Sequence, residues 1–420
     1  MISGRVIVCI GNSWHDDPTS KHHIMRALSS HNDIVWVNYR GTRRPRATAA
    51  DFRSAKEILR RSVMGIERVA PRIHQITPFV LPGGGRFADR VNRRLLVRAI
   101  RNVAAAVDPA RARPVQVWSF APDAAFLVGA LDEECFVYYC TDDYTRFEGF
   151  DLDRIRRTER RLLCLADVVF ATSEELLRRK RLERADITLM RHGVDFDHFA
   201  SAWRQTLPLP TDITEIPRPI LGFFGLIHHW IDVTLIADVA RLRPHYHFVL
   251  IGDCKSDVGV LNCCDNVYLL GRKPYSLLPA YCRAFDVALL PFVRSPMTRA
   301  VNPIKLLEYL AAGLPVVSTS LPEALRVPGP IRFGDRAIDF ARACDESLFG
   351  GSAFCGDIGR CVERESWSDK VCAISDIVQR AQAARESNVT LNQSLSLARS
   401  AGVAGLAPVS ITEGVTSHPC

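Results

Sequence analysis

The sequence predicts an α/β protein with two Rossmann-like domains in tandem, each built on a parallel sheet. Short apolar runs alternate with helical patterns over residues 1–206, and a second series of the same kind occupies 220–366. Such alternation is typical of βαβ units. The passage between the two series, 207–219, holds four prolines and is typical of a linker. We therefore expect a ligand site in the cleft where the two domains face each other.

Length and composition exclude a membrane-spanning chain and a small disulfide scaffold. The 420 residues suffice for two cores, and 47% are apolar while 24% are charged, as in globular proteins. No apolar run approaches the roughly 18 residues of a spanning helix, and the run at 6–10 is too short for a signal peptide. The 13 cysteines are odd in number and form no CxxC pair. We expect a cytoplasmic chain without a zinc site.

The excess positive charge lies entirely in the first half of the chain. Residues 1–200 carry 33 Lys and Arg against 25 Asp and Glu, a balance of +8 that equals the net charge of the whole chain. A helix predicted at 86–107 has an apolar stripe and an arginine-rich remainder, formed by Arg86, Arg90, Arg93, Arg94, Arg98 and Arg101. Such a face is either solvated or lies on anionic lipid headgroups, and the charge excess favours an anionic membrane surface.

The first domain opens with a βαβ unit. A strand at 5–10, a helix at 20–29 and a strand at 33–38 have the lengths that a Rossmann-type sheet uses. Because such sheets bind ligands beyond the carboxyl ends of their strands, residues near this first loop are binding candidates. They are Asn12, Ser13, Trp14, and His22 or His23. For each of them the alternative is ordinary packing or exposure to water.

Two adjacent carboxylates follow a strand predicted at 136–140. Asp142 and Asp143 come directly after this buried run, where a carboxylate is costly unless it caps a helix, binds a cation or acts in chemistry. Capping by one of the two is the competing interpretation. Further strands of the first domain are expected at 115–119, 168–171 and 187–190, with a helix at 155–166.

The most informative stretch of the second domain is 302–319, which is typical of a loop, a short helix, a glycine stop and a buried strand. Lys305 and Glu308 stand one turn apart near the start of this helix, opposite its leucines. The pair suits a sugar nucleotide, because the cation opposes a diphosphate and the carboxylate accepts two hydrogen bonds from ribose hydroxyls. The alternative is a solvated ion pair on an ordinary amphipathic helix, and spacing alone does not decide between them.

Several motifs resemble nucleotide-sugar glycosyltransferases of the two-Rossmann GT-B fold, and most of all the bacterial group 1 (family-4-like) enzymes of cell-wall and exopolysaccharide assembly. In the second half the motifs are Gly225, the strands and turns at 266–275 and 286–292, and the run Asn-Pro-Ile-Lys-Leu-Leu-Glu from Asn302 to Glu308. In the first half the strand-end residues match, namely Trp14, Asp142-Asp143, Thr172-Ser173 and Arg191-His192-Gly193. The likeness covers roughly residues 4–380.

The resemblance implies transfer of a sugar from a nucleotide diphosphate-sugar to an acceptor held by the first domain, with no bound metal or other cofactor. By position, Glu308 would hold the ribose, Lys305 the diphosphate, and the backbone at Gly225 would approach the phosphates. The remaining donor-binding residues would be Arg272, Lys273, Tyr275, Arg299 and Asn302. The acceptor side would hold Asn12, Ser13, Trp14 and His22. An inverting transfer would need a general base, for which we expect Asp142 or Asp143.

Two departures from the family pattern leave retaining or inverting chemistry open. Many relatives carry a Glu eight residues before the ribose Glu, and here that position is Ala300. The Arg and Lys pair that they place after the first glycine loop is replaced by His228, His229 and Trp230. Near the end, Trp367 and the helix at 368–384 resemble the closing helix that these folds send back across the first domain. We expect residues 385–420 to be a largely disordered tail.

We therefore predict a cytoplasmic glycosyltransferase, peripheral at the inner face of the membrane. Its donor would be a nucleotide-sugar, with a UDP-sugar as the default, and its acceptor a lipid-linked or polysaccharide chain; no nucleic-acid partner is expected. One alternative is a sugar-nucleotide epimerase of the same fold. Another is a non-catalytic partner in polysaccharide assembly, for which Ala300 leaves room.

Overall fold

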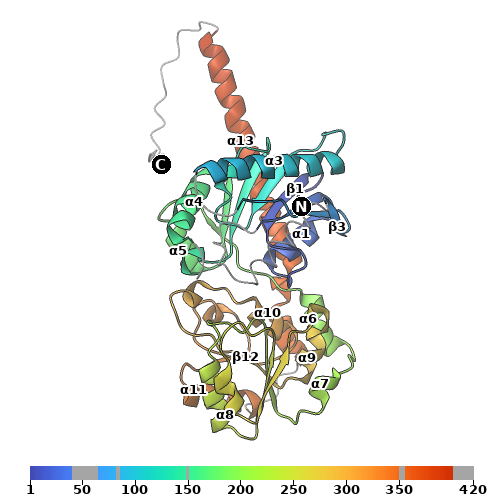
Figure 1. Cartoon of the computed structure of the whole chain (residues 1–420), viewed down its shortest axis with the longest axis vertical. Helices are drawn as coiled ribbons and strands as arrows, with labels where there is room; N and C mark the ends of the chain where they lie inside the picture. The colour runs from blue at the N-terminus through green and yellow to red at the C-terminus, as the bar shows by residue number, and fades with distance from the viewer. Residues whose placement is uncertain (40–64, 82–85, 148–150, 350–354, 401–420) are drawn as a thin grey trace.

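The computed structural model describes residues 1–39, 65–81, 86–147, 151–349 and 355–400. These residues form two sheets, one in each half of the chain, and Figure 1 shows the two halves stacked along the long axis of the molecule. We call the part with the first sheet the N-domain and the part with the second sheet the C-domain. The predicted α/β class with two parallel-sheet domains is confirmed.

The N-domain sheet has the strand order β3-β4-β2-β1-β5-β6-β7-β8, and only β3 and β4 pair in antiparallel fashion. Its strands are β1 (Val6–Gly11), β2 (Asp33–Asn38), β3 (Glu67–Ala70), β4 (Ile73–Ile76), β5 (Val115–Ser119), β6 (Cys135–Cys140), β7 (Val168–Ala171) and β8 (Thr188–Leu189). Strand β1 is central because it pairs with β2 on one side and with β5 on the other. The carboxyl ends of β1, β5 and β6 therefore meet at one edge of the sheet.

Helices cover both faces of this sheet. They are α1 (Ser20–Leu28), α3 (Arg86–Val107), α4 (Leu152–Leu165), α5 (Glu174–Lys180) and α13 (Trp367–Ser400). Side chains of β1 alternate between two buried layers, as the period of a strand requires. Val6, Val8 and Ile10 pack on the side of α3 and α4, and Ile7 and Cys9 pack on the side of α1 and α13. Burial on both faces explains why β1 is apolar along its whole length.

The C-domain sheet is parallel throughout, with the order β11-β10-β9-β12-β13-β14. Its strands are β9 (Ile220–Phe224), β10 (His247–Ile251), β11 (Val267–Gly271), β12 (Val287–Leu290), β13 (Val316–Ser318) and β14 (Ile331–Phe333). Its helices are α6 (Phe196–Arg204), α7 (Thr211–Thr214), α8 (Val233–Leu242), α9 (Leu278–Ala284), α10 (Ile304–Ala311), α11 (Ala337–Phe349) and α12 (Cys355–Arg360). The order reverses at β9, between β10 and β12, and such a switch point is where open α/β sheets bind ligands.

The boundary between the domains lies earlier than the predicted residue 206. Met190 belongs to an N-domain core, whereas Val194 already belongs to the C-domain core. Helix α6, predicted to lie in the first domain, buries Phe199 in the C-domain. The proline-rich passage packs there as well, because Ile213 is only 1% exposed. The proline content of this passage predicted a linker, but its apolar side chains pack in the core of the C-domain.

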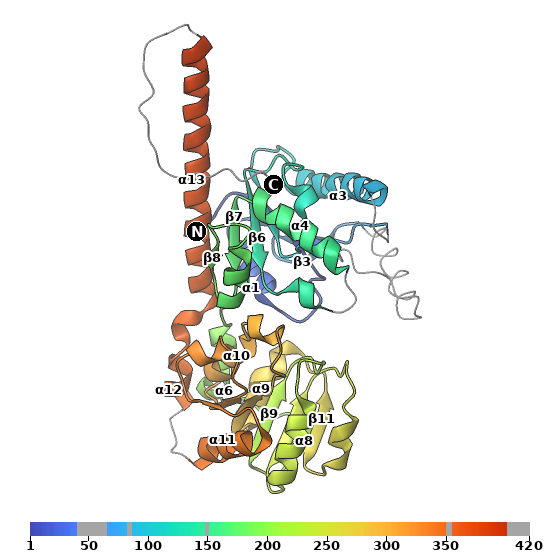
Figure 2. The same ribbon diagram turned by 90° about the vertical axis from the view of Figure 1, so that its left-hand side faces the viewer.

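The chain returns to the N-domain through α13, which runs along one side of that domain and projects past it (Figure 2). Val371, Ile374 and Val378 pack into the N-domain core, as expected for the closing helix. The helix continues to Ser400, so the predicted disordered tail begins too early. No Gly or Pro occurs between 385 and 400, and a helix that is already nucleated gains one hydrogen bond for each residue it adds. Residues 401–420 lie outside the described ranges.

Candidate active site

A pocket of about 260 Å³ opens between the two domains. Its C-domain walls are the carboxyl ends of β9, β10 and β11 together with the first turns of α10, and its N-domain wall is the segment that leads into α1. The lining residues are Asp17, Pro18, Thr19, Phe224, Gly225, Leu226, Ile251, Gly252, Asp253, Arg272, Lys273, Tyr275, Leu278, Ile304, Lys305 and Glu308. Six of the eight predicted donor-binding residues therefore lie at one pocket. We call it the donor pocket.

Gly225 brings the backbone of the β9 loop against Lys305. Its φ of 137° lies in a region that favours glycine. A Cβ at this position would lie 2.8 Å from Lys305 Nζ and closer still to Lys305 Cε. The lysine side chain therefore crosses the space that the absent side chain of Gly225 leaves open, and its ammonium lies beside the loop at the carboxyl end of β9.

Lys305 and Glu308 stand on the first turns of α10, which Leu306, Leu307 and Leu310 anchor in the core. Glu308 is only 6% exposed, and within the described part of the chain no hydrogen bond to its carboxylate occurs. Burial raises the pKa of Glu308 to about 7, Lys305 opposes this shift, and Asp195 adds to it. A buried carboxylate without a partner is costly and suits a ligand that donates hydrogen bonds.

The cations of the turn after β11 are engaged with carboxylates. Arg272 forms an ion pair with Asp17 of the N-domain at 2.7 Å. Lys273 forms an ion pair with Asp212 at 2.6 Å. Both cations line the donor pocket, yet each already has an acidic partner.

Tyr275 lies at the same pocket and stacks on His198 of α6, with ring centroids 4.6 Å apart. His198 Nε2 lies 3.1 Å from the Tyr275 carbonyl oxygen. The Tyr275 hydroxyl oxygen is buried and has no hydrogen-bond partner within the described residues. The ring is thus fixed by packing while its polar end stays available to a ligand.

Arg299 and Asn302 do not line the donor pocket. Arg299 is exposed on the short 3₁₀ turn Thr298–Ala300, and the Asn302 amide donates to the Thr172 carbonyl oxygen at 2.8 Å. The same loop docks on the N-domain a second time, because the Ser173 hydroxyl donates to the Ala300 carbonyl oxygen at 2.7 Å. Ala300 is 1% exposed and packs into an N-domain core. The segment therefore joins the domains, a role that the sequence pattern did not reveal.

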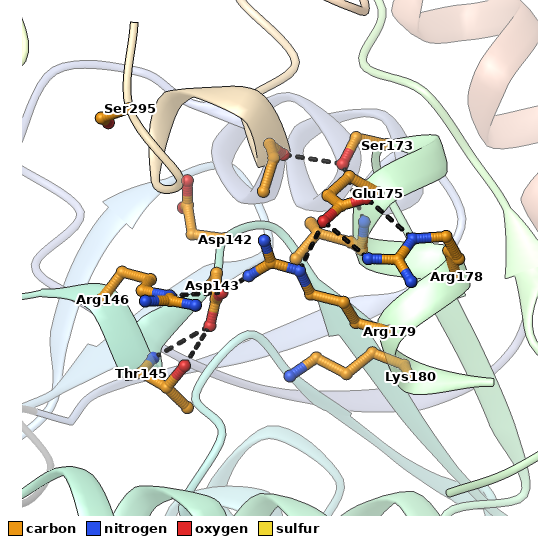
Figure 3. Close-up of polar contacts among 12 residues, drawn as sticks. Asp142, Asp143, Thr145, Arg146, Ser173, Glu175, Arg178, Arg179, Lys180 and Ser295 are labelled. Atoms are coloured by element: carbon orange, nitrogen blue, oxygen red, sulfur yellow. Dashed lines mark hydrogen bonds and ion pairs between the residues drawn. The ribbon is translucent and has the colours of Figure 1, made fainter. Parts of the chain in front are cut away.

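Asp143 is a structural residue in this arrangement (Figure 3). Its carboxylate accepts hydrogen bonds from Thr145 N at 3.2 Å and from Thr145 Oγ1 at 2.5 Å, and it forms an ion pair with Arg179 of α5. Arg146 Nε lies 3.7 Å from Asp143 Oδ2. The side chain caps the turn Tyr144–Arg146, which is the competing interpretation that the sequence left open.

Asp142 points the other way. Figure 3 shows its carboxylate directed away from the arginines around Asp143 and toward the C-domain loop that carries Ser295. Burial raises the pKa of Asp142, whereas a hydrogen bond from Thr141 and the charge of Lys21 lower it. Of the two acids, only Asp143 is held by ion pairs in the part of the chain that the structure describes.

The predicted acceptor-side residues mostly pack with one another. Trp14 contacts the Trp36 and His22 rings, with centroids 5.0 Å and 5.4 Å away. His22 is 1% exposed, its Nδ1 accepts from Thr19 N at 3.1 Å, and its Nε2 lies 3.3 Å from Ser13 O. Burial lowers the pKa of His22 to about 3, so the ring is neutral. These residues shape the start of α1 and do not line the donor pocket.

Asn12 is the exception within this set. Its amide nitrogen donates to Asp16, while its Oδ1 is buried without a partner within the described residues. The N-domain residues that do line the pocket, Asp17, Pro18 and Thr19, were not predicted. Their signal in the sequence was weak, consisting of a Thr at the N-cap of a predicted helix.

Comparison with known proteins relates part of the chain to a described family. Residues 218–348 match the family model described as glycosyl transferases group 1. The chain is 26% identical over 368 residues to TuaH of Bacillus subtilis, which carries the name of a teichuronic acid biosynthesis glycosyltransferase. That match covers 82% of this chain and 88% of TuaH.

Solved structures share the fold. Sucrose-phosphate synthase from Thermosynechococcus elongatus is 16% identical, with a TM-score of 0.64 over 90% of this chain and 100% of that one. HepE of Anabaena in complex with UDP-glucose is 15% identical, with a TM-score of 0.54 over 94% of this chain and 99% of that one. At these identities the likeness establishes the two-domain architecture, which is the one expected from the sequence.

Proposed function

We propose that this chain, a group 1 glycosyltransferase with the GT-B fold, transfers a sugar from a nucleotide diphosphate-sugar to an acceptor bound by its N-domain. One observation carries the proposal. Lys305 and Glu308, a cation and a buried acid without a partner in the described chain, share one pocket with the backbone at Gly225. In this assignment Glu308 accepts the ribose hydroxyls, and Lys305 with the N-terminal N–H groups of α10 binds the diphosphate.

The donor that we propose is a UDP-sugar. The structural neighbour HepE has been solved with UDP and with UDP-glucose, which supports this choice. The Tyr275 ring, fixed by His198, lies at the pocket beside Glu308, where it can contact the nucleoside. The flat, partly buried ring offers the contact area that a planar base needs.

The transfer step uses the cleft between the domains. The acceptor hydroxyl oxygen bonds to the anomeric carbon, the bond from that carbon to the diphosphate oxygen breaks, and its electron pair leaves with the nucleoside diphosphate. In an inverting reaction the hydroxyl proton passes to Asp142, whose raised pKa suits a general base. Lys305 opposes the charge of the leaving diphosphate, so we expect no metal in this step.

The acceptor that we propose is a lipid-linked or polysaccharide chain of the cell envelope, and the name of TuaH supports this class. Helix α3 supports a position at the inner face of the membrane. Arg90, Arg94 and Arg98 are exposed at intervals of four residues, beside Leu95, which is 41% exposed. Such a face suits anionic headgroups. Among the described helices, none is both long enough and apolar enough to span a membrane.

A paired assay tests the proposal and separates its alternatives. Thermal unfolding with UDP-, GDP- and dTDP-sugars identifies the donor, because a ligand of the folded state raises the melting temperature. Nucleoside diphosphate release is then measured with and without membrane extract. Release only with the extract supports transfer, whereas an isomerised sugar nucleotide without acceptor supports the epimerase. Tight binding without turnover under either condition supports a non-catalytic assembly partner.

A further inference from the structure

The donor pocket offers little positive charge that is not already engaged. Arg272 pairs with Asp17 and Lys273 with Asp212, so within the described lining only Lys305 stands without an ion-paired carboxylate. A sugar nucleotide brings two phosphate charges, and the leaving nucleoside diphosphate gains a further charge as the bond breaks. One lysine and a helix N-terminus leave much of this charge unopposed.

Lys21 of the N-domain stands close in sequence to residues that line this pocket, although its own side chain is not part of the lining. It is the second residue of α1 and stands two positions after Thr19, which lines the donor pocket together with Asp17 and Pro18. Its side chain passes over Gly11 at the carboxyl end of β1, where a Cβ on the glycine would lie 3.0 Å from Lys21 Cδ and 3.6 Å from Cε. The absence of a side chain at Gly11 therefore leaves the path that Lys21 occupies.

The groups around Lys21 come from several elements of the N-domain. Asp16 precedes α1, Asp142 follows β6, and His192 follows β8. No carboxylate lies within ion-pair distance of Lys21 Nζ in the part of the chain that the structure describes. His192 is 6% exposed, and its Nδ1 has no partner within the same residues. Burial lowers the pKa of Lys21, and the nearby acids and Cys9 oppose that shift.

We propose that Lys21 is the second cation of the donor site, contributed by the N-domain to the diphosphate of the nucleotide-sugar. The inference rests on the proposed function, because it assumes that the donor pocket holds a diphosphate. Lys21 then opposes Lys305 across the cleft, and the diphosphate bridges the two domains. Lys21 is also close enough to Asp142 for its charge to act on this proposed base. One ammonium group would then act on both the leaving diphosphate and the group that accepts the proton.

Binding of UDP and of uridine to the Lys21→Met variant tests this inference. Methionine keeps the length and packing of the side chain but removes the charge. Titration calorimetry measures the affinity for UDP. Ligand-observed NMR measures the affinity for uridine, which has no phosphate. We expect UDP affinity to fall about 10-fold or more while uridine affinity stays the same, since a charged hydrogen bond to phosphate is lost. Lys21→Arg should recover part of the loss, and Lys255→Met, which removes an exposed lysine outside the pocket lining, should have no effect.

The other outcomes overturn the inference in distinguishable ways. Unchanged UDP affinity, with wild-type binding intact, removes Lys21 from the donor site and leaves the proposed function standing. An equal loss for UDP and uridine with a lower melting temperature assigns Lys21 a structural role. An unchanged UDP affinity together with a raised KM for the acceptor overturns the inference and assigns Lys21 a role in binding the acceptor. A wild-type chain that binds no nucleoside diphosphate refutes the proposed function and Lys21's role together.

Discussion

Arg272 of the C-domain and Asp17 of the N-domain form an ion pair at 2.7 Å, and both residues line the donor pocket. The guanidinium is therefore held by a carboxylate at the place where we propose that a diphosphate binds. The two side chains are 51% and 65% exposed, so the pair contributes little to stability. The pair matters for ligand binding, because Asp17 and the phosphate of a ligand would compete for an ion pair with Arg272.

Replacing Asp17 with Asn should strengthen donor binding. The substitution frees Arg272 and removes a negative charge from the pocket wall, and we expect UDP affinity to rise on the order of 2- to 5-fold. Titration calorimetry at low salt measures the effect. Asp253→Asn is the matched control, because Asp253 lines the pocket without holding Arg272. An equal gain in both variants would assign the effect to net charge alone.

Donor binding should weaken as the pH falls through the pKa of Glu308, which burial raises to about 7. The ionised carboxylate accepts hydrogen bonds from the ribose with both oxygens, whereas the protonated form carries a hydrogen on one of them and no charge. Below pH 7 the protonated form dominates, and affinity for UDP should fall by up to about 10-fold for each pH unit. Calorimetric titrations between pH 5.5 and 8.5 would measure this slope. The Glu308→Gln variant should bind weakly at every pH, and a wild-type curve as flat as that of the variant would contradict the assignment.

The raised pKa of Glu308 also affects the stability of the ligand-free chain, and here a lower pH is favourable. Because the folded-state pKa of Glu308 is raised from 4.5 to about 7, protonation favours the folded chain. The contribution is fully present below pH 4.5 and is lost as the pH rises through 7. Without ligand, Glu308→Gln should therefore melt at a higher temperature than the wild type at pH 8, and the difference should vanish near pH 4.5. A lower melting temperature for the variant at pH 8 would contradict the buried, ligand-free carboxylate.

Gly225→Ala should abolish donor binding without unfolding the chain. The new Cβ would meet the end of the Lys305 side chain and push the ammonium from its place. Gly129→Ala is the matched control, because Gly129 also has a positive φ, of 71°, but no neighbour within 4 Å of a new Cβ. Both variants carry backbone strain, and the melting temperature should fall more for Gly225→Ala, because a φ of 137° is less accessible to alanine than the left-handed region at 71°. Equal UDP binding by the two would show that Lys305 does not depend on the space at Gly225.

The two adjacent aspartates should behave differently on substitution by Asn. Asp142→Asn should lower kcat by roughly 10²- to 10⁴-fold while UDP affinity and melting temperature stay near those of the wild type. Asp143→Asn should lower the free energy of unfolding by about 3 kcal/mol, because the ion pair with Arg179 is lost at a side chain that is 4% exposed. The measurements are steady-state kinetics and denaturant unfolding. An active Asp142→Asn enzyme would remove the base from the mechanism.

Sequence patterns predicted the elements that depend on local order. Strand β2 (Asp33–Asn38), strand β5 (Val115–Ser119) and helix α3 (Arg86–Val107) have the bounds expected from the sequence. Strands β3 and β4 were missed, because Glu67–Ala70 is polar, half-exposed and too short to show alternation. The turn between them depends on Arg72 with a φ of 58°, which residue type does not signal.

The residues that meet at the pocket were predictable where one helix carries them. Lys305 and Glu308 share α10, so their spacing alone places them together. Residues that meet through tertiary packing were not predictable in this way. Asn302 ties the C-domain loop to Thr172, and nothing in its local sequence distinguishes this role from ligand binding. Likewise Asp142 and Asp143 are neighbours in sequence, and only the position of Arg179 separates their roles.

The crystal structure of the chain soaked with UDP tests the central claim most directly. We expect the diphosphate within hydrogen-bond distance of Lys305 Nζ and of the N–H groups at the start of α10, with both ribose hydroxyls donating to Glu308. A nucleotide bound at another place, with Lys305 and Glu308 unchanged and touching no ligand atom, would contradict the account.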